Sequence, residues 1–94
     1  MTITLDQTFA ASEDVVSREV NGEMVLLDLA SGEYFGLAEV GCRIWDLLSI
    51  EARSLADLCD VVEAEYEAPR DLIEADVLAL ATDLEARDLI VSVG

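Results

Sequence analysis

The sequence predicts an α+β fold in which a three-stranded antiparallel sheet at the N-terminal end is followed by three helices. Two strand-like runs flank Asn21-Gly22, a second turn signal stands at Ala30-Ser31-Gly32, and three segments with apolar residues at helical spacing fill the second half. This order resembles a winged-helix arrangement with its sheet placed first. Because 94 residues suffice for one modest core, we expect a single domain over residues 1–94.

The first two strands are expected at Val15–Val20 and residues 23–29. Asn-Gly joins them because this pair readily takes positive φ values at both central positions of a type I′ turn. Along the second strand, period-two alternation places Val25, Leu27 and Leu29 on one face. We expect this face to meet the helices.

The third strand is expected at residues 33–37 and returns alongside the second. Alternation groups Phe35 with Leu37 on one side and Tyr34 with Gly36 on the other. One flank of this strand has no partner in the pattern, which makes it a candidate free edge. Three occupants are considered for that edge: the N-terminal arm, a second copy of the chain, or an extended peptide added as a fourth strand.

The first predicted helix covers residues 39–50. Its apolar residues recur at helical spacing, so we expect a broad inward stripe with Trp45 in the core. The stripe consists of Val40, Ile44, Leu47 and Leu48. A second helix is expected over residues 54–66, because Ser54 is a suitable N-cap with Asp57 three residues further on.

The third predicted helix covers residues 69–87, because Pro69 suits the first turn of a helix. Its main apolar stripe consists of Ile73, Val77, Leu80 and Leu84. A neighbouring row contains Leu72, Asp76, Ala79 and Asp83, for which a solvated acidic face is the plain interpretation.

The two ends of the chain are less clearly patterned. Residues 1–12 alternate slightly before Phe9, and they could form an extended arm that packs Leu5 or Phe9 on the sheet. Residues 88–94 look extended, and they could add a short strand or pack beneath the helices.

Charge is the strongest compositional signal. Five arginines, with no lysine or histidine, stand against 21 acidic residues and give a net charge of −16. Such a surface repels phosphate, so we expect no nucleic-acid partner; an acidic surface that favours solubility and a preference for cationic partners are the two interpretations. The apolar runs are short and no signal peptide is recognisable, so we expect no membrane span and a cytoplasmic location.

The residue types on which most catalytic sites depend are missing. Without histidine the chain has no Ser-His or Cys-His pair, and it shows no Gly-rich phosphate loop or metal-binding motif. Cys42 and Cys59 fall near apolar stripes without CxxC spacing, so we expect small buried hydrophobes in a reducing compartment. We therefore expect a binding protein with no metal and no cofactor, and not an enzyme.

Two stretches carry a family resemblance: VLLDLASGEYFGLAEVGCRIWDLL at residues 25–48 and EADVLALATDLEARDLI at residues 74–90. Their order resembles the PqqD family, which includes the RiPP recognition elements that bind leader peptides of ribosomally made, modified peptides. The likeness covers residues 15–91. Ala38 departs from it, since relatives often have a polar residue there, usually Asn, that caps the first helix.

The resemblance implies a non-catalytic adaptor on which the leader peptide pairs as an added strand. The residues it assigns to peptide binding are Glu33, Tyr34, Phe35 and Gly36 on the third strand and Leu72, Asp76, Ala79, Leu80 and Asp83 on the third helix. Independently, the missing side chain of Gly36 lets another backbone approach closely. Plain core packing is the alternative for Phe35 and Leu80, and solvation is the alternative for Asp76 and Asp83.

The resemblance also implies the partners: a precursor leader peptide, a leader peptidase and a cyclase, as in lasso-peptide pathways. One alternative is the PqqD role in pyrroloquinoline quinone synthesis, in which the precursor is presented to a radical SAM enzyme. Another is a module that dimerises through its edge strand. We expect a monomer or a weak homodimer.

Overall fold

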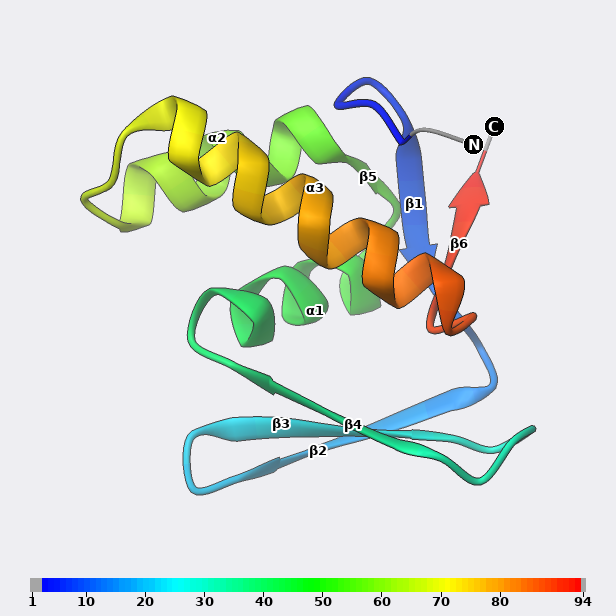
Figure 1. The fold of residues 1–94 in the computed structure, drawn as a ribbon. Helices are drawn as coiled ribbons and strands as arrows, with labels where there is room; N and C mark the ends of the chain where they lie inside the picture. The colour runs from blue at the N-terminus through cyan, green and yellow to red at the C-terminus, as the bar shows by residue number, and fades with distance from the viewer. Residues whose placement is uncertain (1–2, 94) are drawn as a thin grey trace.

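The structure, a computed structural model, describes residues 3–93, so Met1, Thr2 and Gly94 at the ends of the predicted arm and tail lie outside the described residues. Residues 3–93 form three helices and two three-stranded antiparallel sheets in the order β-β-β-β-α-β-α-α-β (Figure 1). The predicted α+β class is confirmed. The second sheet was not predicted.

The predicted meander consists of β2 (Val15–Val20), β3 (Glu23–Asp28) and β4 (Tyr34–Ala38), which pair in the order β2-β3-β4. Asn21 and Gly22 have φ values of 53° and 82°, as a type I′ turn requires, so the predicted hairpin is confirmed. β4 lies at one edge of this sheet, also as predicted.

The sheet turns the opposite face of β3 to the core from the one that we predicted. Met24 and Leu26 are buried, whereas Leu29 remains 59% exposed. Asp28 lies on the same face of β3 as Met24 and Leu26, but it is the last residue of the strand. There its carboxylate accepts hydrogen bonds from the Ala30 N–H and the Ser31 hydroxyl, both at 3.0 Å, and so braces the turn into β4.

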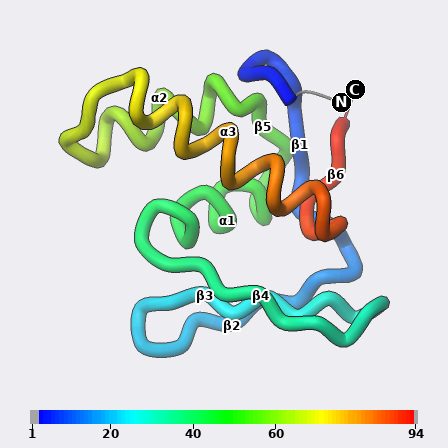
Figure 2. The backbone as a smooth tube through the Cα atoms, in the orientation of Figure 1, coloured from blue at the N-terminus to red at the C-terminus, as the bar shows by residue number. Residues whose placement is uncertain are grey.

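The N-terminal arm is the central strand of the second sheet. β1 (Thr8–Ala11) pairs with β5 (Arg53–Ser54) on one side and with β6 (Ile90–Val93) on the other. Phe9 is fully buried in the core, so the arm does not simply lie on the first sheet. The C-terminal tail forms a short strand, which was one of its two expected conformations. Figure 2 shows β1 and β6 side by side above the β2-β3-β4 sheet.

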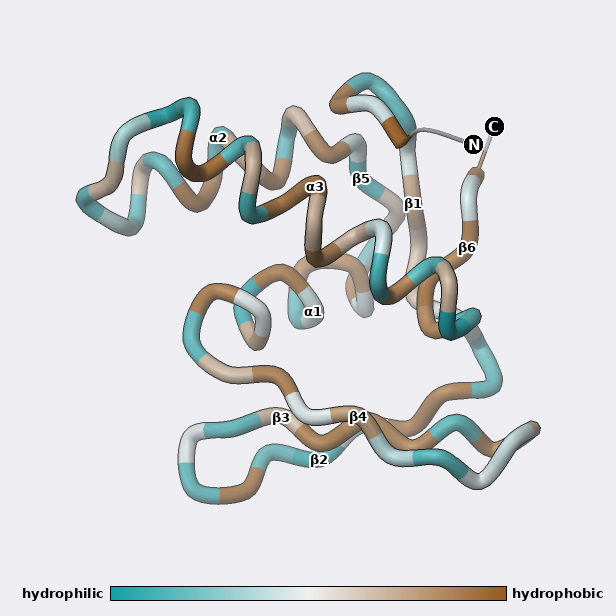
Figure 3. Tube along the Cα trace, in the orientation of Figure 1, coloured by the Kyte–Doolittle hydropathy of each residue, from teal (hydrophilic) through white to brown (hydrophobic). Residues whose placement is uncertain are grey.

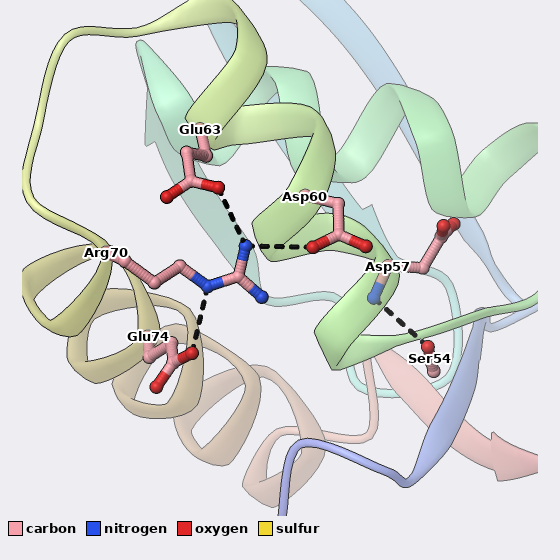
Figure 4. Close-up of polar contacts among 6 residues, drawn as sticks. All are labelled: Ser54, Asp57, Asp60, Glu63, Arg70 and Glu74. Carbon is pink, nitrogen blue, oxygen red and sulfur yellow. Dashed lines mark hydrogen bonds and ion pairs between the residues drawn. The ribbon is translucent and has the colours of Figure 1, made fainter.

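The three helices are α1 (Val40–Ile50), α2 (Leu55–Glu65) and α3 (Arg70–Ala86). The predicted cap of α2 is confirmed, because the Ser54 hydroxyl accepts a hydrogen bond from the Asp57 N–H at 3.1 Å (Figure 4). The N-cap of α1 is Glu39, not Ala38, since Ala38 is still paired with Glu23 as the last residue of β4. Glu39 has a positive φ of 51° and makes no side-chain cap.

One hydrophobic core joins both sheets to the helices. It contains Trp45 and Cys59, as predicted, whereas Cys42 is only half-buried. On α3 the buried stripe includes Ala81 in place of the predicted Leu80, which is half-buried. Figure 3 shows apolar residues along the inward sides of the helices and also along the β2-β3-β4 sheet.

Arg70 connects α2 to α3 at the surface. Its guanidinium donates to Asp60 at 2.8 Å and Glu63 at 3.2 Å on α2 and to Glu74 at 2.9 Å on α3 (Figure 4). The hydrogen bond to Glu74, followed by that to Asp60, raises the pKa of Arg70 above its ordinary value. Because the group is exposed to solvent, we expect it to orient the two helices more than to stabilise them.

The orientation of β3 predicts a difference between two leucine truncations. Leu26→Ala should lower the free energy of unfolding by about 3 kcal/mol, because it leaves a cavity in the core. Leu29→Ala, with the same change in volume at an exposed site, should change it by less than about 0.5 kcal/mol. Urea unfolding followed by circular dichroism measures both, and equal losses would contradict the assigned orientation.

Candidate functional site

The free flank of β4 presents backbone groups to solvent. The Asp28 N–H donates to the Glu33 carbonyl at 3.0 Å. This bond shows which residues of β4 turn their backbone groups toward β3 and which turn them outward. Because paired residues alternate in an antiparallel ladder, Phe35 bonds to β3 while Tyr34 and Gly36 turn their N–H and C=O groups outward. Within residues 3–93 no other strand pairs with β4 on that side.

A groove runs beside this flank. It encloses a hollow of about 260 Å³ between β4, α1 and α3. The lining residues are Phe35, Gly36, Leu37 and Ala38 from β4, Val40, Gly41 and Ile44 from α1, and Asp76, Val77 and Leu80 from α3. A mostly apolar hollow with a carboxylate at its wall, next to unpaired backbone groups, suits an extended peptide with an apolar anchor.

Two glycines shape the groove in different ways. A Cβ on Gly41 would lie 3.3 Å from the Leu37 side chain, so the glycine lets α1 approach β4 closely. A Cβ on Gly36 would meet no other atom within 4 Å. The β4 backbone at Gly36 is therefore open to a second chain.

Arg87 packs against Phe35, one of the residues that line the hollow. Its guanidinium lies 4.7 Å from the centroid of the Phe35 ring, and its Nε donates to the Asp83 carboxylate at 3.2 Å. This arrangement ties the C-terminal end of α3 to β4 through a cation–π contact. Asp83 is thus already paired with Arg87. The sequence analysis did not predict a role for Arg87, although its position four residues after Asp83 is the spacing of an ion pair on one helix face.

The predicted peptide-binding residues fall into two groups. Phe35, Gly36, Asp76 and Leu80 line the hollow, from β4 and α3 as expected. The others lie around it: Glu33 precedes β4, Leu72, Ala79 and Asp83 are exposed on α3, and the Tyr34 side chain is 70% exposed on the far face of the sheet. Tyr34 can therefore offer its backbone to a strand added beside β4, whereas its ring can contact only the side chains that this strand turns to the far face of the sheet.

The prediction also missed the contribution of α1. Val40, Gly41 and Ile44 form one wall of the hollow. In the sequence, the helical spacing of Val40 and Ile44 indicated only core packing. The one signal of a special role was Gly41, because a glycine inside a predicted helix often marks close packing.

We also searched the described residues for a metal site, a reactive cysteine and a membrane-spanning helix. Residues 3–93 contain no cluster of three or more side chains placed to hold a metal ion. Burial raises the pKa of the Cys59 thiol, so this cysteine behaves as a small core residue. None of the helices described is both long and apolar enough to cross a bilayer.

The chain is similar to one known protein family and to two solved structures. The family model described as coenzyme PQQ synthesis protein D (PqqD) matches residues 23–90. A search of curated proteins finds no match.

Two solved structures are similar over most of their length. One is "TbiB1 in Complex with the TbiA(beta) Leader Peptide", with a TM-score of 0.79 and 37% identity over 86% of this chain and 93% of that chain. The other is "Lasso peptide synthetase B1 complexed with the leader peptide", with a TM-score of 0.69 and 30% identity over 88% of this chain and 96% of that one. Both are complexes of a protein with a leader peptide.

Proposed function

The chain belongs to the PqqD family, and from this premise we propose that it is an adaptor that binds the leader of a ribosomally made precursor peptide and presents the precursor to separate modifying enzymes. The observation that carries the proposal is the unpaired flank of β4 beside an apolar groove. Support for a lasso-peptide setting comes from the two similar structures, which are TbiB1 and a lasso peptide synthetase B1, each in complex with a leader peptide.

The leader would bind by strand addition. Its backbone would pair with the outward N–H and C=O groups of Tyr34 and Gly36, which supplies affinity with little dependence on sequence. A disordered leader loses conformational entropy when it docks, so one or more apolar side chains must also be buried. The hollow lined by Phe35 and Leu80 would hold such an anchor, and Asp76 would accept a hydrogen bond from the leader.

An adaptor of this kind separates recognition from chemistry. Binding a constant leader raises the effective concentration of the variable core peptide at the enzyme that modifies it. In this proposal the adaptor binds, and a leader peptidase and a cyclase supply the chemistry. We further propose that residues 1–94 act as one domain in this role.

A second candidate follows from the description of the family model. It is the presentation of a precursor to a radical SAM enzyme in pyrroloquinoline quinone synthesis. The same groove would serve both roles. Titration with leaders of the two kinds of precursor separates them, because the groove should prefer its own leader.

The strand-addition mechanism predicts that Gly36→Pro abolishes leader binding without unfolding the sheet. Proline removes the outward N–H and places its ring against the incoming strand, whereas the bonds to β3 come from the neighbouring residues. Binding of a fluorescent leader should weaken at least about tenfold by polarisation. Circular dichroism should be unchanged.

Gly36→Ala is the matched control, because it keeps the N–H and its Cβ meets open space. The alanine variant keeps the outward N–H and should therefore bind the leader more tightly than the proline variant does. Wild-type affinity in the proline variant would show that the leader does not pair with this flank.

The apolar anchor predicts that Leu80→Asp weakens leader binding at least about tenfold, since a charge would line the hollow. Leu80 is half-buried and outside the buried stripe of α3, so the fold should persist. Ile50→Asp, at an exposed site on the end of α1, makes the same chemical change away from the groove and should bind normally. Equal affinities for the two variants would rule out the hollow as the anchor site.

A further inference from the structure

The face of the β2-β3-β4 sheet that points away from the helices contains a second, larger hollow. Its volume is about 460 Å³, and its lining comes from all three strands. The residues are Val16, Ser17, Arg18 and Val20 on β2, Val25 and Leu27 on β3, and Tyr34 on β4. Val16, Leu27 and Tyr34 are cross-strand neighbours and form a continuous apolar row.

No described element covers this face. The helices lie on the other side of the sheet, and in Figure 1 the sheet forms the lower boundary of the molecule. Val16 and Val20 are 48% and 45% exposed, and the Tyr34 ring is more exposed still. A contiguous apolar surface of this kind on a small protein marks an interaction site.

Arg18 lies beside this apolar row, between Val16 and Val20 along β2 and opposite Val25. The other four arginines each form an ion pair with a carboxylate of the chain: Arg43 with Glu65, Arg53 with Asp57, Arg70 with Asp60 and Arg87 with Asp83. Among residues 3–93 no carboxylate lies within ion-pair distance of Arg18, although the chain has 21 acidic residues. A guanidinium held on an apolar surface suits a carboxylate brought by another molecule.

We propose that this outer face docks a partner protein whose surface presents apolar side chains around a carboxylate that pairs with Arg18. This inference rests on the proposed function, because the partner that we name is an enzyme that acts on the leader-bound precursor. β4 belongs to both surfaces: Tyr34 offers its backbone to the groove and its ring to the outer face. Adaptor-bound leader and docked enzyme would therefore meet along one strand.

Charge argues against the other occupants of this face. In a symmetric dimer that packed face against face, the residues that line this face would bring no carboxylate to Arg18, and two chains of net charge −16 would repel each other. The same net charge disfavours nucleic acid and anionic lipid. A protein with a local carboxylate is the occupant that remains.

The test titrates the purified leader peptidase and cyclase encoded with the precursor against the full chain, with and without fluorescent leader. Arg18→Gln and Val16→Ser should each weaken binding of one enzyme at least about tenfold. Neither residue lines the leader groove, so leader affinity should stay within about twofold of wild type. Matched controls are Arg43→Gln and Ile50→Ser, which remove an arginine and an exposed aliphatic side chain from other surfaces and should leave enzyme binding intact.

Wild-type affinity of both face variants for both enzymes would overturn the proposal. So would a wild-type dimer in sedimentation that Val16→Ser dissociates, because the face would then be occupied by a second copy. Failure of the wild-type chain to bind leader would contradict the proposed function alone, since the titrations without leader test the docking face independently.

Discussion

The free flank of β4 depends on where the two ends of the chain find their own hydrogen bonds. β1 and β6 pair with each other in the second sheet, and β5 takes the remaining side of β1. Neither terminal strand is therefore available to cover β4. Edge strands are usually shielded by a helix or loop, whereas here α1 and α3 stand back and leave a hollow beside the edge.

This arrangement divides recognition between backbone and side chains. The outward groups of Tyr34 and Gly36 can bind almost any extended segment, so selectivity must come from the walls of the groove. Those walls are held in place by ordinary packing: Gly41 brings α1 against Leu37, and Arg87 joins α3 to Phe35. The opposite face of the same strand remains open for a second partner.

Local patterns predicted the parts of the fold that local interactions determine. The Asn21-Gly22 turn, the Ser54 cap and the three helices follow from neighbouring residues. The second sheet joins residues 8–11, 53–54 and 90–93, whose pairing depends on long-range contacts that periodicity does not reveal. The buried face of β3 was misassigned because both faces are apolar, and the apolar outer face is itself a candidate binding surface. The resemblance to PqqD proteins indicated β4 and α3 as the elements of the proposed site, whereas the α1 wall of the hollow and the contact of Arg87 with Phe35 required the structure.

Amide hydrogen exchange of β4, measured by NMR with and without the leader, tests the central claim most directly. In the free protein the N–H groups of Tyr34 and Gly36 should exchange rapidly, while that of Phe35 should be protected by its bond to β3. Leader binding should slow exchange at Tyr34 and Gly36 by at least about tenfold, because the added strand accepts their hydrogen bonds. Protection of these two amides in the free protein, or unchanged exchange at saturating leader, would contradict the account.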